Sequence, residues 1–242
     1  MLAMVAIGAA AVGCLSTASA NAIYDAETIF TLILRDVSDA EGSRYDSWSV
    51  VAEEYFIDGD VFTSGDGIVS VEDSIAANCY RELGVGDDVT QFTHTSGASG
   101  EGIAESYVLN ELGVQVENDS LEELTFTFDY KYLLSASVGS ATHAEGDDAL
   151  AYGGIDVVDD FFSVDILDEA YADLILGPEE DKSWSGSTFS FTLSPGDYNY
   201  ISIFSYSSGI AIGAQSVPEP ATLALLGIGL VCLGISRARK IS

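Results

Sequence analysis

The clearest pattern in the chain is an alternation of large apolar side chains with small or charged ones, at a period of two residues. From Leu124 to Tyr132 every second residue is Leu, Phe or Tyr, and Thr, Asp or Lys stands between them. Successive side chains of a β-strand point to opposite sides, so this spacing places all five large side chains on one face of a sheet. The same spacing recurs over residues 162–166 and 189–193. These segments are predicted to be strands with one buried face.

A turn signal lies between the last two alternating runs. Ser194-Pro195-Gly196-Asp197 places Pro and Gly at the two central positions of a type II turn. Residues 187–206 are therefore predicted to form a β-hairpin. Weaker strand patterns occupy residues 28–35, 48–57, 68–71 and 106–116.

Two segments depart from the strand pattern. Ile75, Cys79 and Leu83 recur at a spacing of four residues before Gly84, which predicts a helix over residues 73–83. Residues 95–102 are rich in Gly and Ser and are predicted to form a surface loop or a boundary between subdomains. The many short strands separated by Gly, Ser and Asp turns indicate an all-β fold, an antiparallel β-sandwich of jelly-roll type.

The chain begins with an uncharged, apolar segment. Residues 1–13 have the length and composition of the apolar part of a secretory signal, although no Lys or Arg precedes it. Ala18-Ser19-Ala20 and Ala20-Asn21-Ala22 both match the small residues that signal peptidase accepts. We therefore predict a signal peptide over residues 1–22, cut after Ala20 or Ala22. The alternatives are a buried N-terminal helix and a lipoprotein box at residues 11–14, with a lipid on Cys14 but Ala where Leu is usual.

The other end of the chain combines three features in order. Val217-Pro218-Glu219-Pro220 is followed by sixteen uncharged residues, 221–236, and then by Arg237-Ala238-Arg239-Lys240. A helix of that length spans about 24 Å, and flanking residues extend it to the ~30 Å of a hydrocarbon core. The basic end predicts a cytoplasmic C-terminus with the rest of the chain outside. A core helix of a globular domain is the alternative.

This order of Pro-Glu-Pro, apolar helix and basic end resembles the PEP-CTERM sorting signal of Gram-negative bacteria. The resemblance covers residues 217–240 and assigns residues 217–242 to a sorting signal and residues 23–216 to the exported body. It implies that an exosortase, a membrane-embedded cysteine transpeptidase, cuts nearby and releases or transfers the body.

The resemblance also assigns roles within the tail, none of them catalytic. The residues recognised by the exosortase are Val217, Pro218, Glu219 and Pro220. The apolar run is a transient anchor in the inner membrane, and its orientation is set by Arg237, Arg239 and Lys240. Such systems accompany exopolysaccharide and biofilm-matrix production, which implies an extracellular polysaccharide as a partner and the cell surface or extracellular space as the destination.

Charge and composition exclude several classes of protein. Residues 21–217 hold 38 of the 39 acidic residues and 5 of the 8 basic ones, a net charge of −33 against −31 for the whole chain. This charge repels phosphate backbones and excludes nucleic-acid binding. An apolar content of 48% excludes wholesale disorder. Cys79 is the one Cys of the body, so an intrachain disulfide is excluded in an oxidising compartment.

The sequence carries no signature of a catalytic centre. His94 and His143 lie in polar Ser/Thr/Gly contexts and are predicted to be exposed loop residues. No motif pairs either with a nucleophile or a metal. Carboxylates are so abundant that a two-carboxylate glycosidase stays open.

Calcium is the one ion that the acidic residues suggest, and no cofactor is required. Asp58, Asp60 and Asp66 lie in Gly-containing segments that offer oxygen donors to a hard cation, without the spacing of an EF-hand. Solvated turns are the alternative. Further candidates of the same kind are Asp147, Asp148, Asp156, Asp159 and Asp160.

Aromatic residues suggest a second kind of ligand. Tyr198, Tyr200, Phe204 and Tyr206 share one face of the last predicted strand, which we expect to be buried against the second sheet. The alternative is a flat platform that stacks on pyranose rings. Trp48 and Trp184 are better candidates for such an exposed platform.

Three functions follow from these features. We expect an exported, non-enzymatic protein of the cell surface or extracellular matrix, sorted by an exosortase and associated with exopolysaccharide or biofilm. A carbohydrate-binding β-sandwich module is the alternative. A secreted glycoside hydrolase or lyase is the third.

Overall fold

The computed structural model describes residues 22–213 apart from residues 43–46, 76–79, 141–146 and 162. It likewise leaves out the side chains of residues 54–57, 74–75 and 183–186. The described part of the chain consists of eleven β-strands and their turns, with no helix.

Within that part, no helix has the length and hydropathy that crossing a membrane requires. The apolar run at residues 221–236 lies outside it.

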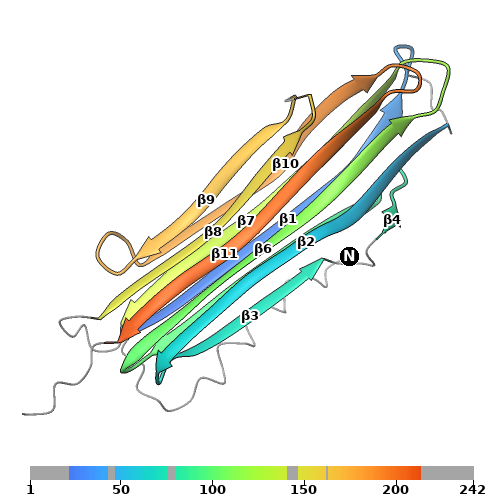
Figure 1. Ribbon diagram of the computed structural model, residues 1–242. Coiled ribbons are helices and arrows are strands. Elements are labelled where there is room, and N and C mark those ends of the chain that lie inside the picture. The colour runs from blue at the N-terminus through green and yellow to red at the C-terminus, as the bar shows by residue number, and fades with distance from the viewer. Residues whose placement is uncertain (1–21, 43–46, 76–79, 141–146, 162, 214–242) are drawn as a thin grey trace, which may run out of the picture.

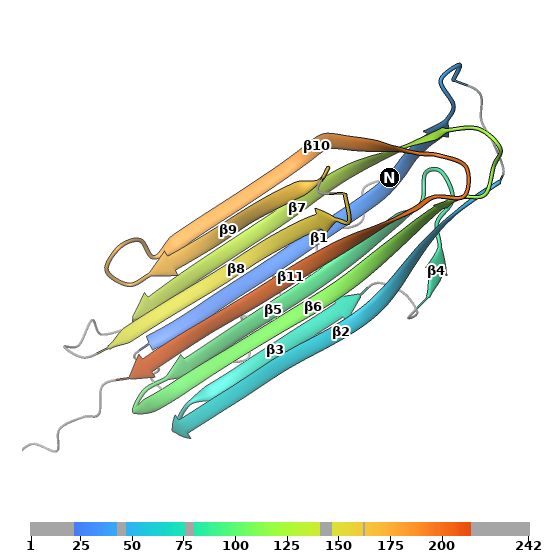
Figure 2. The same ribbon diagram turned by 45° about the horizontal axis from the view of Figure 1, so that its top comes forward.

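The strands form two antiparallel sheets packed face to face (Figures 1 and 2). In spatial order, sheet A contains β10 (Glu179–Leu193), β7 (Leu124–Ser140), β1 (Ala22–Ser38), β5 (Asp88–Ser99) and β3 (Ile68–Ile75). Sheet B contains β4 (Arg81–Glu82), β2 (Trp48–Gly65), β6 (Gly102–Asn118), β11 (Tyr198–Gly213), β8 (Asp148–Asp159) and β9 (Asp165–Asp173). The all-β, antiparallel prediction is confirmed, and the jelly-roll type stays a prediction.

Most of the predicted strands and their buried faces are found in the two sheets. The strand predicted over residues 162–166 is wrong in its bounds, because residues 163 and 164 lie outside any strand and β9 begins at Asp165. All five large residues from Leu124 to Tyr132 belong to β7, and Leu124, Phe126 and Phe128 are fully buried. The rings of Phe126 and Phe191 stack with centroids 6.0 Å apart, which ties β7 to β10. The weaker strand patterns lie within β1, β2, β3 and β6.

The predicted hairpin between the last two strands is wrong, although its turn is correct. Gly196 has φ 79°, and the Asp197 N–H donates to the Ser194 carbonyl over 3.0 Å, as a type II turn requires. The strands on either side do not pair with each other: β10 pairs with β7, whereas β11 pairs with β6 and β8. Each strand has one apolar face and directs it into the core from its own sheet, where β10 packs against β9 and β11 packs against β1 and β5.

The predicted helix over residues 73–83 is also wrong where the structure describes it. Asp73 and Ile75 end β3 and pair with β5, while Arg81 and Glu82 form β4. Leu83 is buried, and its N–H donates to the Val50 carbonyl over 2.8 Å. A three-residue apolar repeat is a weak helical signal that strand pairing overrides. Cys79 lies outside the described residues.

The Gly- and Ser-rich residues 95–102 are not a surface loop. They form the end of β5, a two-residue turn and the start of β6, and Thr95 and residues 97–100 are buried. Gly97 leaves room for the ring of Tyr24, its partner on the neighbouring strand β1: a Cβ at Gly97 would lie 2.2 Å from that ring. Small residues here mark tight packing, so the predicted loop or subdomain boundary is wrong.

The described chain enters and leaves the sandwich at the same end. Ala22, the first residue of β1, is buried and lies opposite Ser99 and Ser140. Gly213, the last residue of β11, lies opposite Gly102. The strands run from this end along the long axis of the molecule (Figure 1).

The interior also contains a polar seam, defined as the buried polar residues that β5, β6 and β11 direct between the sheets. Within the described part of the chain, six of their side-chain atoms are buried without a hydrogen-bond partner: Gln91 Oε1, Thr93 Oγ1, Thr95 Oγ1, Asn110 Oδ1, Ser205 Oγ and Ser207 Oγ. Thr28 of β1 lies directly opposite Thr93, but its hydroxyl donates to the Tyr206 carbonyl over 2.9 Å. Adjacent buried threonines therefore differ in one hydrogen bond.

This difference predicts opposite effects for one substitution. Thr93→Val removes an unpaired buried hydroxyl and is expected to raise the free energy of unfolding by about 1 kcal/mol. Thr28→Val removes a paired hydroxyl together with its hydrogen bond to the Tyr206 carbonyl, and is expected to lower the free energy of unfolding by about 1 kcal/mol. Urea unfolding of both variants measures the difference. Equal destabilisation would contradict the prediction and indicate a bound water as the partner of Thr93.

Candidate functional site

The aromatic stripe of the last strand lies on the outer face of sheet B, so its expected burial is wrong. Ile201 and Ile203 of β11 are fully buried, whereas Tyr200, Phe204 and Tyr206 point to the other side and are half-buried. The buried aromatic rings of the described core come from β1, β7 and β10, all in sheet A. We call the outer face of sheet B the aromatic face; its aromatic side chains are Phe62, Tyr107, Tyr152, Tyr171, Tyr198, Tyr200, Phe204 and Tyr206.

A row of three tyrosines crosses the aromatic face. Strand pairing places Tyr107 of β6 opposite Ser208 of β11, Ser208 opposite Tyr152 of β8, and Tyr152 opposite Tyr171 of β9. Neighbouring strands lie about 4.8 Å apart, which separates Tyr107 and Tyr152 by about 10 Å across the small Ser208. Tyr107 is 37% exposed and Tyr171 is 40% exposed. These side chains form a flat strip that is open to a ligand.

The ring of Tyr206, in the neighbouring row, supports the row of tyrosines through Tyr152. The rings of Tyr152 and Tyr206 stack with centroids 5.4 Å apart, and the Tyr206 hydroxyl donates to Glu169 Oε1 over 3.1 Å. Burial, together with Tyr152 and Glu169, raises the pKa of Tyr206 far above its usual range. Its hydroxyl therefore stays protonated and remains a hydrogen-bond donor at neutral pH.

The aromatic face is uniformly acidic. Its carboxylates include Asp58, Asp60, Glu105, Glu111, Asp156, Glu169 and Asp173. The basic side chains within the described residues all lie elsewhere. Arg35, Lys131 and Lys182 belong to sheet A, and Arg81 of β4 donates to the Asp88 carbonyl of β5 in sheet A.

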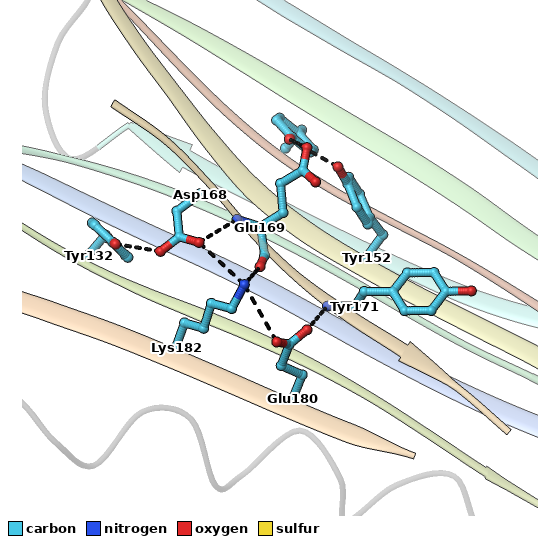
Figure 3. Close-up of polar contacts among 8 residues, drawn as sticks. Tyr132, Tyr152, Asp168, Glu169, Tyr171, Glu180 and Lys182 are labelled. Carbon is cyan, nitrogen blue, oxygen red and sulfur yellow. Dashed lines mark hydrogen bonds and ion pairs between the residues drawn. The ribbon is translucent and has the colours of Figure 1, made fainter. Parts of the chain in front are cut away.

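A charged clamp joins the two sheets beside this face (Figure 3). Lys182 Nζ of β10 lies 3.3 Å from Asp168 Oδ1 of β9 and donates to the Glu169 carbonyl. The Tyr132 hydroxyl of β7 donates to Asp168 Oδ2 over 2.5 Å, and Glu180 of β10 accepts the Tyr171 N–H over 2.7 Å. Strands β7 and β10 of sheet A are thereby tied to β9 of sheet B.

The clamp residues are held in their ordinary charge states. Burial works to raise the pKa of Asp168, but hydrogen bonds from Tyr132, the Glu169 N–H and Lys182 outweigh it and lower that pKa. Burial likewise opposes a charge on Lys182, yet Asp168 and Glu180 raise its pKa. Both shifts move away from neutrality, so the pair is suited to holding the sheets together and not to transferring protons near pH 7.

His94 is not the loop residue that its polar sequence context predicts. It lies in β5 on the outer face of sheet A, between Glu27 of β1 and Glu72 of β3, with a side chain only 13% exposed. Its Nε2 lies 3.3 Å from Asp25 Oδ2, and the hydrogen bond to Asp25 raises the pKa of His94. Burial raises the pKa of Glu27, with Asp25 and Asp181 adding to the effect. His143 lies outside the described residues.

The calcium candidates lie far apart in the structure. Asp58 and Asp60 are exposed on β2, whereas Asp66 lies in the turn after it and accepts the N–H groups of Gly100 and Glu101. Six residues of strand, about 20 Å, separate Asp60 from Asp66. Among the described residues, no three His, Cys, Asp or Glu side chains are grouped so as to hold a metal ion. The further candidate Asp159 instead accepts hydrogen bonds from Ser163, Val164 and Asn199.

The two tryptophans were expected to form exposed platforms. The prediction for Trp48 is wrong, because its ring packs against the core, edge-on to Phe126, with ring centroids 6.3 Å apart. The side chain of Trp184 lies outside the described residues. The exposed rings are instead those of Tyr107 and Tyr171, with the half-buried Tyr152 between them, and the sequence interpretation missed all three. Each of these tyrosines lies in a short alternating run, at every second position together with polar side chains. That spacing was the sequence signal of an outward-facing ring.

The His94 cluster predicts that stability falls as the pH rises toward 8. The pKa of His94 is raised above 6.5 in the folded state, so its contribution is complete below about pH 6.5 and is lost as the pH rises through the folded value. Ionisation of the half-buried Glu27 acts in the same direction. Urea unfolding should show a free energy of unfolding about 1 kcal/mol higher for wild type than for His94→Asn at about pH 6, with the gap closing as the pH rises through the folded-state pKa of His94.

Asp25→Asn should flatten the pH dependence of the free energy of unfolding as His94→Asn does, because it removes the carboxylate that pairs with His94. Parallel pH profiles for wild type and His94→Asn would contradict the assignment.

The residues assigned to sorting and orientation, 217–220 and 237–240, lie outside the described residues, and a comparison with known families bears on them. The model of the family described as "PEP-CTERM protein-sorting motif" matches residues 216–240. Neither the curated proteins nor the solved structures contain a match to the chain. The chain is therefore a protein with a PEP-CTERM sorting motif, and the motif indicates an exported protein that is processed by an exosortase at the membrane.

Proposed function

We propose that the body of this protein is a non-enzymatic, polysaccharide-binding module of the extracellular matrix, which reaches its place through exosortase sorting. The observation that carries the proposal is the aromatic face, where Tyr107, Tyr152 and Tyr171 form one row across strands β6, β8 and β9. The sugar-binding interpretation of the sequence is thus moved from the tryptophans to these tyrosines.

The chemistry of this face suits a glycan. The exposed ring faces offer apolar area to the C–H groups of a pyranose, while hydroxyl and carboxylate groups beside them accept or donate hydrogen bonds to sugar hydroxyls. Exposed aromatic groups on a charged surface commonly mark an interaction site. The outer surface of a sheet gives a long polymer several strands to lie across.

The placement of the chain ends supports a role at the surface or in the matrix. Gly213 is the last described residue before the sorting motif and lies at the same end of the sandwich as Ala22. From this end β2 extends through 18 residues, about 60 Å. The tyrosine row lies five strand residues, about 17 Å, from Gly213, and so in the part of the aromatic face nearest the end of the sandwich where the described chain finishes.

The start of β1 favours one of the two signal-peptide sites. Ala22 is fully buried and lies between Ser99 of β5 and Ser140 of β7. Cleavage after Ala20 leaves this residue in the exported protein, whereas cleavage after Ala22 removes it. We therefore propose that the mature protein begins at Asn21.

Removal of the tyrosine row is expected to abolish most of the glycan binding. The double substitution Tyr107→Ala and Tyr171→Ala removes two stacking surfaces and should reduce affinity about tenfold or more. The full chain in detergent is measured by affinity electrophoresis against neutral, anionic and amine-bearing polysaccharides. Tyr80→Ala is the control, because Tyr80 is 59% exposed and lies outside the aromatic face. Equal retention of all variants would refute the proposed binding surface.

Sorting has its own test in the cell. Replacing Pro218, Glu219 and Pro220 with Ala is expected to leave the unprocessed protein in the inner membrane, because the exosortase no longer recognises the motif. Fractionation shows where each protein is retained. The intact mass of the exported wild-type protein reports where both ends are cut, and a mature N-terminus at Asn21 is expected. Normal processing of the variant would contradict the role of the motif.

A further inference from the structure

The charge of the aromatic face restricts the polymers that it can accept. Its described residues include many carboxylates and no Lys, Arg or His. A uronate or phosphate-bearing polymer would place like charges against this face and be repelled by it. A neutral polymer would leave the carboxylates without a counter-charge.

The charges of the body are segregated between its two outer faces. On sheet A, Lys131 lies on the outer face, and Arg35 lies 3.3 Å from Asp129. Lys182 is held by Asp168 and Glu180 in the clamp. Among the described residues, the ion pairs of Arg35 and Lys182 therefore lie on sheet A and at the sheet edge. The aromatic face has no described cation of its own, although Lys182 lies close enough to offset part of the rise in the pKa of Tyr152.

Carboxylates and rings are interleaved on this face. Asp60 of β2 shares a row with Tyr107, and Asp58 and Glu169 lie at opposite ends of the neighbouring row. Asp156 lies one row further along β8 and is half-buried. A chain of sugars lying on the tyrosine row would therefore have carboxylates on both sides of it.

We propose that the aromatic face binds a polysaccharide with free amino groups, such as a partly N-deacetylated polymer of an aminosugar. The pyranose rings stack on Tyr107, Tyr152 and Tyr171, and the ammonium groups pair with the carboxylates between the rings. This inference rests on the proposed function, since it specifies the class of polymer that the same face accepts.

The test compares three oligosaccharides of equal length with the full chain in detergent. The probes are β-1,4-linked glucosamine oligomers, their fully N-acetylated counterparts and galacturonate oligomers, measured by calorimetry at two salt concentrations. The glucosamine oligomer should bind about tenfold more tightly than the N-acetylated one, and the galacturonate oligomer should not bind. Raising the salt should weaken the glucosamine complex, because salt screens its ion pairs.

Two triple variants of equal charge separate a site from general attraction between opposite charges. Asp58→Asn, Glu105→Gln and Asp156→Asn together remove three charges from the aromatic face and should weaken glucosamine-oligomer binding about tenfold. The control removes three charges from the outer face of sheet A through Glu72→Gln, Glu179→Gln and Asp181→Asn, and should leave the affinity within about twofold. An equal loss in both variants would overturn the inference.

The remaining outcomes distinguish the inference from the proposed function. Equal affinity for the amino and N-acetylated oligomers, or preference for galacturonate, overturns the inference while leaving a polysaccharide-binding face. Absence of binding to every probe and every polysaccharide of the panel overturns the proposed function itself. Light scattering that shows dimers dependent on Tyr107 and Tyr171 assigns the face to a second copy of the chain and overturns both.

Discussion

The interior of this sandwich accepts only one side of every strand, and this constraint determines what the rest of the molecule presents. In β11, Ile201 and Ile203 are buried, so Phe204 and Tyr206 must face outward. The same rule places the large residues of β7 inside and leaves its Thr, Asp and Lys outside. Sheet A supplies the buried aromatic rings, from β1, β7 and β10, and the tyrosines of sheet B lie on its outer face.

Within one strand, alternation predicted which residues share a face, but it did not predict which of two apolar faces is buried. The stripe that ends at Tyr206 has aromatic residues at every second position except Ser202, and it lies on the outer side of its sheet, whereas the run from Leu124 to Tyr132 lies on the inner side. The outcome depends on what the facing sheet offers. Against β11 stand the small and polar residues of β5, among them Gln91 and Thr93, which leave room for aliphatic side chains and serines.

Local sequence patterns could not predict which strands pair, for the same reason. The turn at Ser194–Asp197 could be predicted because Pro and Gly restrict their own backbone. The choice of β7 and β6 as partners for β10 and β11 depends on contacts far along the chain. His94 was misassigned in a similar way: its Ser and Thr neighbours suggested a loop, but in β5 those residues line the polar seam and the outer face of sheet A.

The distribution of charge gives the acidity of the chain a specific meaning. A net charge of −33 spread evenly would serve solubility alone. The structure instead balances part of it with Lys182 and Arg35, and leaves the aromatic face without a described cation. Holding uncompensated carboxylates beside exposed tyrosines costs electrostatic free energy in the free protein. A ligand that brings positive charge along a line of stacked rings recovers that energy on binding, whereas a neutral or acidic polymer does not.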